Sequence, residues 1–214
     1  AITVKNLESG EVSAQPYDTL VLATGASPIR PPIEGADLPN VFILNGLSDM
    51  DRIAAAASKS SKVCVVGAGF IGLELVENLR ERGLEVVLVE MLDQVMPPLD
   101  WEMSQPLLQE LRLHGVEVHV GETVAKIGDG GVKLKSGADI PCDFVCMCAG
   151  VAPNSSLARE AGLDLGIKGH VKVDVTGKTS DPDIYAVGDV VETVDFVTGG
   201  PTAVPLAGPA NRQG

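Results

Sequence analysis

One stretch, from Lys62 to Leu75, constrains the fold more than any other part of the sequence. Residues 63–66 form an apolar run rich in β-branched side chains, which is typical of a strand buried on both faces. Gly67, Gly69 and Gly72 follow in the spacing G-x-G-x-x-G. In a dinucleotide-binding turn the first glycine permits the tight bend, the second lets a pyrophosphate approach the backbone, and the third lets the helix pack closely on the strand. We therefore predict a strand–turn–helix unit whose helix N-terminus presents free N–H groups to phosphates.

The residues after the turn also support a nucleotide site. A helix is predicted over residues 70–82, with Gly83 as its C-cap, and a second strand over residues 85–90. Glu90 ends that strand 18 residues after Gly72, where a dinucleotide domain places the acid that binds ribose hydroxyls. Residues 91–94 offer no Arg or Lys for a 2′-phosphate, so the sequence predicts NADH over NADPH. A βαβ unit that binds no ligand stays open as the alternative.

Composition and charge limit the classes of partner. The 214 residues are 45% hydrophobic but include only four Phe, two Tyr and one Trp, so aliphatic side chains must fill the core. A net charge of −13 disfavours nucleic acid and anionic membranes. No apolar run approaches 18 residues, and the chain opens directly on a predicted strand, so we expect neither a transmembrane helix nor a signal peptide.

The four cysteines, Cys64, Cys142, Cys146 and Cys148, contain no C-x-x-C pair. We interpret them as buried strand thiols of a protein in the reducing cytoplasm, and we predict no metal site. Alternation along one strand predicts that the last three share a face, and burial should raise the pKa of their thiols.

The remaining segments predict a mixed α/β chain. A hairpin and a buried strand ending in Thr24-Gly25 are expected before residue 26, and a proline-rich crossing covers residues 26–41. A helix is predicted near residues 101–114, with Pro106 either in its first turn or at a kink. Glycine turns within residues 122–141 predict a small antiparallel meander, and a buried strand follows at residues 142–150.

Four signatures together resemble the flavin-dependent pyridine nucleotide–disulfide oxidoreductases, in the branch of coenzyme A-disulfide reductases, NADH oxidases and NADH peroxidases. They occur in the family's order and cover essentially the whole chain. In sequence letters they are LATGASP at 22–28, VGAGFIGLE at 66–74, AGVAPN at 149–154 and DIYAVGD at 183–189.

The resemblance implies an α/β fold of Rossmann-like FAD- and NAD(P)-binding type. Residues 41–149 are similar to the inserted NAD(H)-binding domain, which is complete. Residues 1–40 and 150–214 are similar to parts of the FAD-binding domain.

The resemblance also implies site residues. Phe70 matches an aromatic that lies over the flavin, and Glu74 matches an acid near the nicotinamide and the flavin. The residues implied to bind the cofactors are Gly67, Gly69, Phe70, Ile71, Gly72, Glu90 and Gly150 for the nicotinamide nucleotide and Thr24, Gly25, Gly188, Asp189, Leu206 and Ala207 for FAD. Taken alone, Thr24 could be a turn residue, Asp189 a helix cap, Phe70 a core aromatic and Glu74 a solvated helix acid.

Three parts of the family pattern are missing from this sequence. They are the first G-x-G-x-x-G, which holds the FAD pyrophosphate, the redox cysteine, and the C-terminal dimerisation domain. We therefore expect the chain to be part of a longer flavoenzyme, and weak FAD binding by this part alone.

The resemblance implies an NADH-dependent flavoprotein oxidoreductase, with hydride passing from NADH to FAD and onward to a disulfide, a thiol-based acceptor or oxygen. The full-length enzyme is expected to be a cytoplasmic homodimer. Two alternatives stay open: a nucleotide-binding module without turnover, and a reductase that passes electrons to ferredoxin or rubredoxin.

Overall fold

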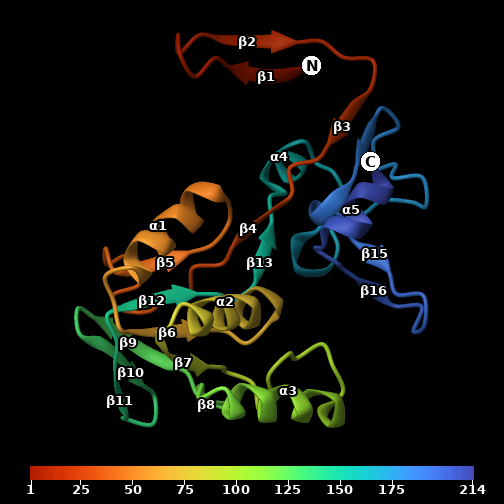
Figure 1. The fold of residues 1–214 in the computed structure, drawn as a ribbon. Helices are drawn as coiled ribbons and strands as arrows, with labels where there is room; N and C mark the ends of the chain where they lie inside the picture. The colour runs from red at the N-terminus through yellow and green to blue at the C-terminus, as the bar shows by residue number, and fades with distance from the viewer. The chain divides into compact units, whose positions relative to one another are not determined.

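The computed structural model describes all residues from 1 to 214, and the chain divides into two compact units (Figure 1). The middle unit is Pro28–Gly150, and the flanking unit combines Ala1–Ser27 with Val151–Gly214. The sequence had suggested that residues 28–40 belong with residues 1–27 in the FAD-binding part, whereas in the structure they pack with the middle unit. The reason is packing, because the side chains of Ile33 and Leu38 lie against the core of the middle unit.

A five-stranded parallel sheet organises the middle unit, in the order β5-β12-β6-β7-β8. The central strand β6 is flanked by β12 and β7. The interior residues of all three strands are buried, and β12 is buried throughout. Parallel strands covered on both faces need such continuous apolar sequence. The bounds are β5 (Val41–Ile43), β6 (Lys62–Val66), β7 (Glu85–Val89), β8 (Glu117–His119) and β12 (Phe144–Met147).

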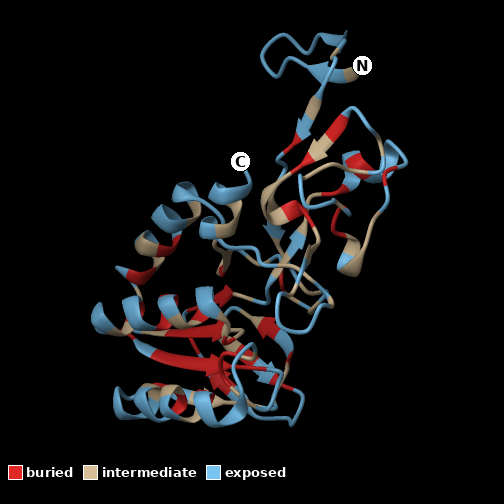
Figure 2. Ribbon diagram, turned by 90° about the vertical axis from the view of Figure 1, so that its right-hand side faces the viewer, coloured by how far each residue is buried: buried red, intermediate tan, exposed pale blue.

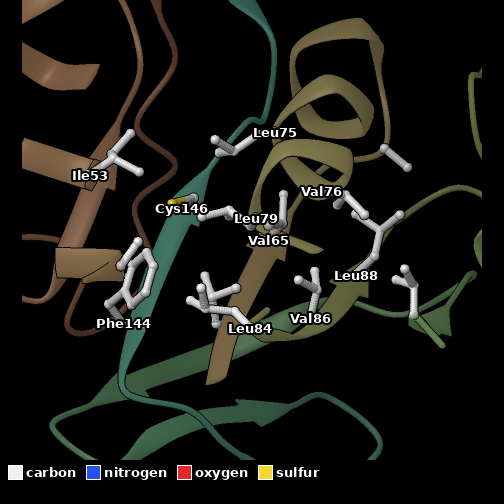
Figure 3. Close-up of a cluster of buried hydrophobic side chains, with 14 of the residues drawn as sticks. Ile53, Val65, Leu75, Val76, Leu79, Leu84, Val86, Leu88, Phe144 and Cys146 are labelled. Atoms are coloured by element: carbon white, nitrogen blue, oxygen red, sulfur yellow. The ribbon is translucent and has the colours of Figure 1, made fainter. Parts of the chain in front are cut away.

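Three helices cover one face of this sheet: α1 (Leu47–Ala57), α2 (Phe70–Glu81) and α3 (Trp101–Leu113). Their apolar stripes pack on alternate residues of the strands, as Figure 3 shows for Leu75 and Leu79 of α2 beside Val65 of β6. The outward helix faces are exposed, whereas the strands between the layers are buried (Figure 2). None of the helices combines the length and the apolar character that crossing a membrane requires.

A second, antiparallel sheet covers the other face of the parallel sheet. It contains β9 (Val124–Gly128), β10 (Gly131–Leu134) and β11 (Asp139–Pro141), which confirms the predicted meander. The remaining alternate residues of the parallel strands, such as Cys64 and Val87, pack against it. The middle unit thus has three layers, with helices, parallel sheet and antiparallel sheet in that order.

Pro106 lies inside α3, as its sixth residue, and not in its first turn. Proline has no N–H for the carbonyl of Glu102, one turn earlier. Glu102 is exposed, so water can satisfy that carbonyl.

The flanking unit is built from short two-stranded pairings around a smaller core. The hairpin β1 (Ile2–Lys5) and β2 (Val12–Gln15) is antiparallel, and β3 (Leu20–Leu22) pairs in parallel with β14 (Ile184–Ala186). Leu22, Ile184 and Ala186 belong to the core cluster of this unit. The other elements are β4 (Ala26–Pro28), β13 (Val151–Pro153), β15 (Thr193–Val194), β16 (Pro201–Thr202), α4 (Ser156–Glu160), α5 (Ala207–Gln213) and two short 3₁₀ turns, Ile167–Gly169 and Gly188–Val190.

The cysteines do not all follow the predicted pattern. Cys146 and Cys148 pack toward the helices, whereas Cys142 packs on the opposite face with Cys64, so the prediction of one shared face is wrong. Strand alternation holds only within a continuous strand, and the chain is not in a strand at residues 142 and 143, between β11 and β12.

The thiols also differ in their acidity. Burial raises the pKa of Cys146, and it raises the pKa of Cys148 to about 12. Cys64 donates a hydrogen bond to the sulfur of Cys142, which raises the pKa of Cys64 and lowers that of Cys142. The prediction that burial raises the pKa at Cys142 is therefore wrong, because this hydrogen bond outweighs burial there.

Asp143 joins the starts of two neighbouring strands. One of its carboxylate oxygens accepts hydrogen bonds from the backbone N–H groups of Lys62, at 2.9 Å, and Ser61, at 2.7 Å. These two bonds lower the pKa of the Asp143 carboxyl. The side chain therefore fixes the entry of β12 beside β6.

Replacing Asp143 by Ala should lower the free energy of unfolding by about 1 kcal/mol at pH 7, because solvent screening keeps this exposed charge-assisted pair at the weak end of its range. The folded-state pKa is lowered, so the contribution is complete above the unfolded pKa of about 3.9 and disappears as the pH falls through the folded value. Urea titrations from pH 7 to pH 3 should show the difference from wild type shrinking.

Asp139→Ala is the matched control, because Asp139 is 76% exposed and only approaches Lys133, at 3.9 Å. It should change the free energy of unfolding by less than about 0.5 kcal/mol. Equal losses in the two variants would contradict the role of Asp143.

Candidate functional site

The glycine turn between β6 and α2 is closely packed. Gly67 has φ of +107°, and a Cβ there would overlap the carbonyl group of Cys148, just after β12. A Cβ on Gly72 would overlap the carbonyl oxygen of Gly67. Both positions therefore exclude any other residue, because the obstructing atoms are backbone.

Gly69 differs from the other two glycines. It is the N-cap of α2, its φ and ψ of −80° and −171° are ordinary, and a Cβ there would meet no protein atom within 4 Å. The space beside this residue is thus open, although the turn around it is tight. An open approach to the backbone at the N-cap is what a bound pyrophosphate requires.

The first turn of α2 carries unused hydrogen-bond donors. The earliest intrahelical bond here runs from the N–H of Leu73 to the carbonyl of Gly69, at 3.0 Å, so the N–H groups of Phe70 to Gly72 have no partner within the helix. No side chain caps them. These donors and the positive end of the helix dipole favour an anion.

Glu90 lies immediately after β7 and is 7% exposed. Its Oε2 accepts a hydrogen bond from the N–H of Ala68, at 2.6 Å, and its Oε1 accepts one from the N–H of Leu92, at 2.8 Å. The acid predicted to bind ribose therefore also contacts the glycine turn directly. Each carboxylate oxygen keeps a lone pair for a further donor.

Phe70 and Glu74 lie one turn apart on α2, so they share one side of the helix. Phe70 is 50% exposed, which sets aside the simple interpretation as a core aromatic. Ile71 is 39% exposed beside it, and Glu74 is exposed. These three side chains are accessible to a ligand at the helix N-terminus.

Gly150 ends the segment that follows β12. Its carbonyl accepts a hydrogen bond from the N–H of Ile29, at 2.9 Å, and its φ is +94°. The preceding residues, Cys148 and Ala149, are those closest to Gly67. Gly150 thus lies two residues after Cys148, which the glycine turn packs against.

In the flanking unit, a hollow of about 540 Å³ brings together four of the six residues predicted to bind FAD. Gly25, Gly188, Asp189 and Ala207 all line it, although they come from three separate parts of the chain. Mostly small side chains form its wall, so backbone groups are accessible within it.

Thr24 and Leu206 do not line this hollow. The hydroxyl of Thr24 donates a hydrogen bond to the carbonyl of Asn154, at 2.7 Å, and the side-chain amide of Asn154 donates one to the carbonyl of Thr24, at 2.9 Å. Thr24 therefore holds two segments of this unit together that are distant in the sequence. Leu206 is the N-cap of α5, directly before Ala207.

Sequence reasoning missed other residues that line the hollow. They are Ala23, Val187, Ala210, Asn211 and Gly214. Ala210, Asn211 and Gly214 follow Ala207 at the helical spacings of three, four and seven, so one face of a predicted helix could have located them.

Comparison with known proteins shows the family of this chain. The whole chain, residues 1–214, matches the family described as pyridine nucleotide-disulphide oxidoreductase. The chain belongs to this family.

Relatives in the family and their structures extend beyond this chain. An NADH oxidase of Methanocaldococcus jannaschii is 43% identical over 205 residues, which cover 92% of this chain and 45% of that protein. Reduced Bacillus anthracis CoADR-RHD is 47% identical with a TM-score of 0.95, over 99% of this chain and 39% of that one. A water-forming NADH oxidase from Lactobacillus brevis, solved with bound NADH, is 31% identical with a TM-score of 0.93. The match covers 99% of this chain and 48% of that one. The chain thus spans about half the length, or less, of these family members.

The open space at Gly69 allows a test of whether the glycine turn binds phosphate. Gly69→Val should lower the affinity for NADH at least tenfold, because the branched side chain would occupy the approach to the backbone. The free energy of unfolding should fall by less than about 1 kcal/mol, since only the N-cap preference changes. Isothermal titration calorimetry and urea unfolding measure the two quantities.

Gly72→Ala is the contrasting variant, because its Cβ would overlap backbone and should cost at least about 1–3 kcal/mol of stability. Normal NADH binding by a folded Gly69→Val protein would rule out the turn as the phosphate site.

Proposed function

We propose that this chain is the NADH-binding part, with a portion of the FAD-binding part, of an NADH-dependent flavoprotein oxidoreductase. The observation that carries the proposal is the glycine turn, whose unpaired N–H groups, open approach at Gly69 and adjacent acid Glu90 fit a dinucleotide. When bound, NADH supplies a hydride that FAD accepts and passes onward as electrons. The residues of this chain bind and orient the two groups.

Each part of the middle unit has a role in holding NADH. The N–H groups at the start of α2 donate hydrogen bonds to the pyrophosphate, and Gly69 leaves room for it. Glu90 accepts hydrogen bonds from the adenosine ribose hydroxyls. Phe70, half exposed at the start of α2, and the exposed Glu74 one turn later would contact the nicotinamide and flavin rings, as the family resemblance implies.

Glu90 also supports a preference for NADH over NADPH. Its carboxylate repels a 2′-phosphate, and residues 91–94 supply no cation to receive one. A hydrogen bond to a charged group contributes about 1.5–3 kcal/mol, so a preference of tenfold or more is expected.

FAD binding is supported less fully by this chain. Gly25, Gly188, Asp189 and Ala207 line one hollow, and the Asp189 carboxylate would accept a hydrogen bond from the ribityl chain, as the family resemblance implies. No second G-x-G-x-x-G is available for the FAD pyrophosphate. The chain alone should therefore bind NADH while holding FAD poorly, because much of the binding free energy is missing.

The electron acceptor of the proposed whole enzyme receives the electrons that FAD takes from NADH. The names of the relatives support a disulfide, a thiol-based acceptor or oxygen: they include NADH oxidases and a coenzyme A disulfide reductase. A homodimeric enzyme in the cytoplasm completes the proposal, and the four unpaired thiols agree with a reducing compartment.

Separate calorimetric titrations of the chain with NADH, NADPH and FAD test the proposal. We expect stoichiometric NADH binding, at least tenfold weaker NADPH binding, and no FAD retained through purification. Absence of NADH binding by a folded protein would overturn the proposed function. Stoichiometric FAD in the purified chain, visible as yellow colour, would overturn only the account of FAD.

Met91→Arg tests the selectivity. Met91 follows Glu90 directly and is 66% exposed, so an arginine there can reach a 2′-phosphate without disturbing the core. NADPH affinity should rise at least fivefold while NADH affinity stays within twofold. Met91→Gln is the control of similar length without charge, and an equal effect of both variants would contradict the electrostatic explanation.

A further inference from the structure

Ala68, between the first two glycines of the turn, is held at both ends. Its side chain is fully buried, its N–H donates to Oε2 of Glu90 at 2.6 Å, and its carbonyl accepts a hydrogen bond from the N–H of Met96 at 2.8 Å. Gly67 and Gly69 on either side have the widest backbone freedom of any residue type. The orientation of the peptide groups between them therefore depends on these two external contacts.

Met96, which makes the second of these contacts, has an unusual backbone conformation. Met96 has φ of +48° and is one of only two non-glycine residues in the chain with positive φ. It is 9% exposed, and its neighbour Val95 is completely buried in the core beneath the helices. A left-handed non-glycine residue is unfavourable and persists only when its surroundings fix it. Its N–H is directed at Ala68.

The segment that carries Met96 is fixed at its other end by the same carboxylate. Oε1 of Glu90 accepts a hydrogen bond from the N–H of Leu92, at 2.8 Å, and the carbonyl of Leu92 accepts one from Gly121, at 2.7 Å. Both ends of the segment 90–96 are thus hydrogen-bonded to Ala68, through the Glu90 side chain at its start and the Met96 N–H at its end. We call Glu90, Ala68 and Met96 the Ala68 clamp.

We propose that Glu90 and Met96 are positioning residues for the pyrophosphate site, acting through the Ala68 clamp. By fixing both ends of the Ala68 residue, they orient Gly69 and the N–H groups of the first turn of α2 before a ligand arrives. The affinity for pyrophosphate-containing ligands then depends on the backbone of Met96, although Met96 need not touch the ligand. This inference rests on the proposed function of the glycine turn.

Met96→Pro is the decisive variant in the 214-residue chain. Proline has no N–H to donate to Ala68 and holds φ near −65°, so it removes both features of the clamp. The affinities for NADH and ADP-ribose should fall at least tenfold. The affinity for adenosine, which has no phosphate, should stay within twofold, as followed by NMR titration.

Met96→Gly and Met96→Ala are the matched controls. Both keep the N–H, and glycine accepts positive φ without strain, so both should bind NADH within threefold of wild type. Circular dichroism establishes that each variant is folded. Normal NADH affinity in folded Met96→Pro, or an equal loss for adenosine, would overturn the positioning role.

Amide hydrogen exchange of the wild-type chain keeps the inference testable if Met96→Pro does not fold. The N–H groups of Met96 and Ala68 should both be protected without any ligand, like core amides. Exchange of Met96 at the rate of an unprotected loop amide would overturn the clamp. If wild type binds no NADH, the proposed function fails, whereas the clamp itself is still judged by this exchange measurement.

Discussion

The close approach of backbone to backbone at Gly67 is the constraint on which the rest of the middle unit depends. The turn leaving β6 packs against the chain just after β12 and against the first turn of α2, with no room for a side chain at Gly67 or Gly72. This contact fixes where α2 lies on the parallel sheet, so the core between α2 and β6 can close as Figure 3 shows. The same approach leaves the N–H groups of the helix facing open space at Gly69. Tight packing and ligand access are therefore two results of one local geometry.

The acid at the end of β7 connects this turn to the next loop. A carboxylate that is 7% exposed needs hydrogen-bond donors, and Glu90 takes them from the backbone of Ala68 and Leu92. The proposed role of Glu90 in NADH binding therefore overlaps with its observed role in holding the turn. Substituting Glu90 would change both, which is why an added cation at Met91 is the cleaner probe of coenzyme selectivity.

The sequence predicted what depends on local pattern and failed where distant segments decide. The β6–α2–β7 unit, its three glycines and the meander follow from periodicity and turn residues. The opposite orientation of Cys142 does not, because it results from a break in the strand at a residue pair that also holds Asp143 against Ser61 and Lys62. Likewise, the hydrogen bonds between Thr24 and Asn154 span 130 residues, and no local pattern announces them. The shared exposure of Phe70, Ile71 and Glu74 was predictable, because one helix turn presents these residues together.

The central claim is that the glycine turn binds a dinucleotide pyrophosphate in a middle unit that is already folded. The most direct measurement is a ¹H–¹⁵N NMR titration of the labelled chain with NADH, following the backbone amides. The account predicts that the largest shifts fall on Gly69, Phe70 and Ile71, with smaller shifts at Met91 and Leu92 near the ribose, while the amides of β9 to β11 stay unchanged. Largest shifts on β9 to β11, or none on the first turn of α2 at saturating NADH, would contradict it.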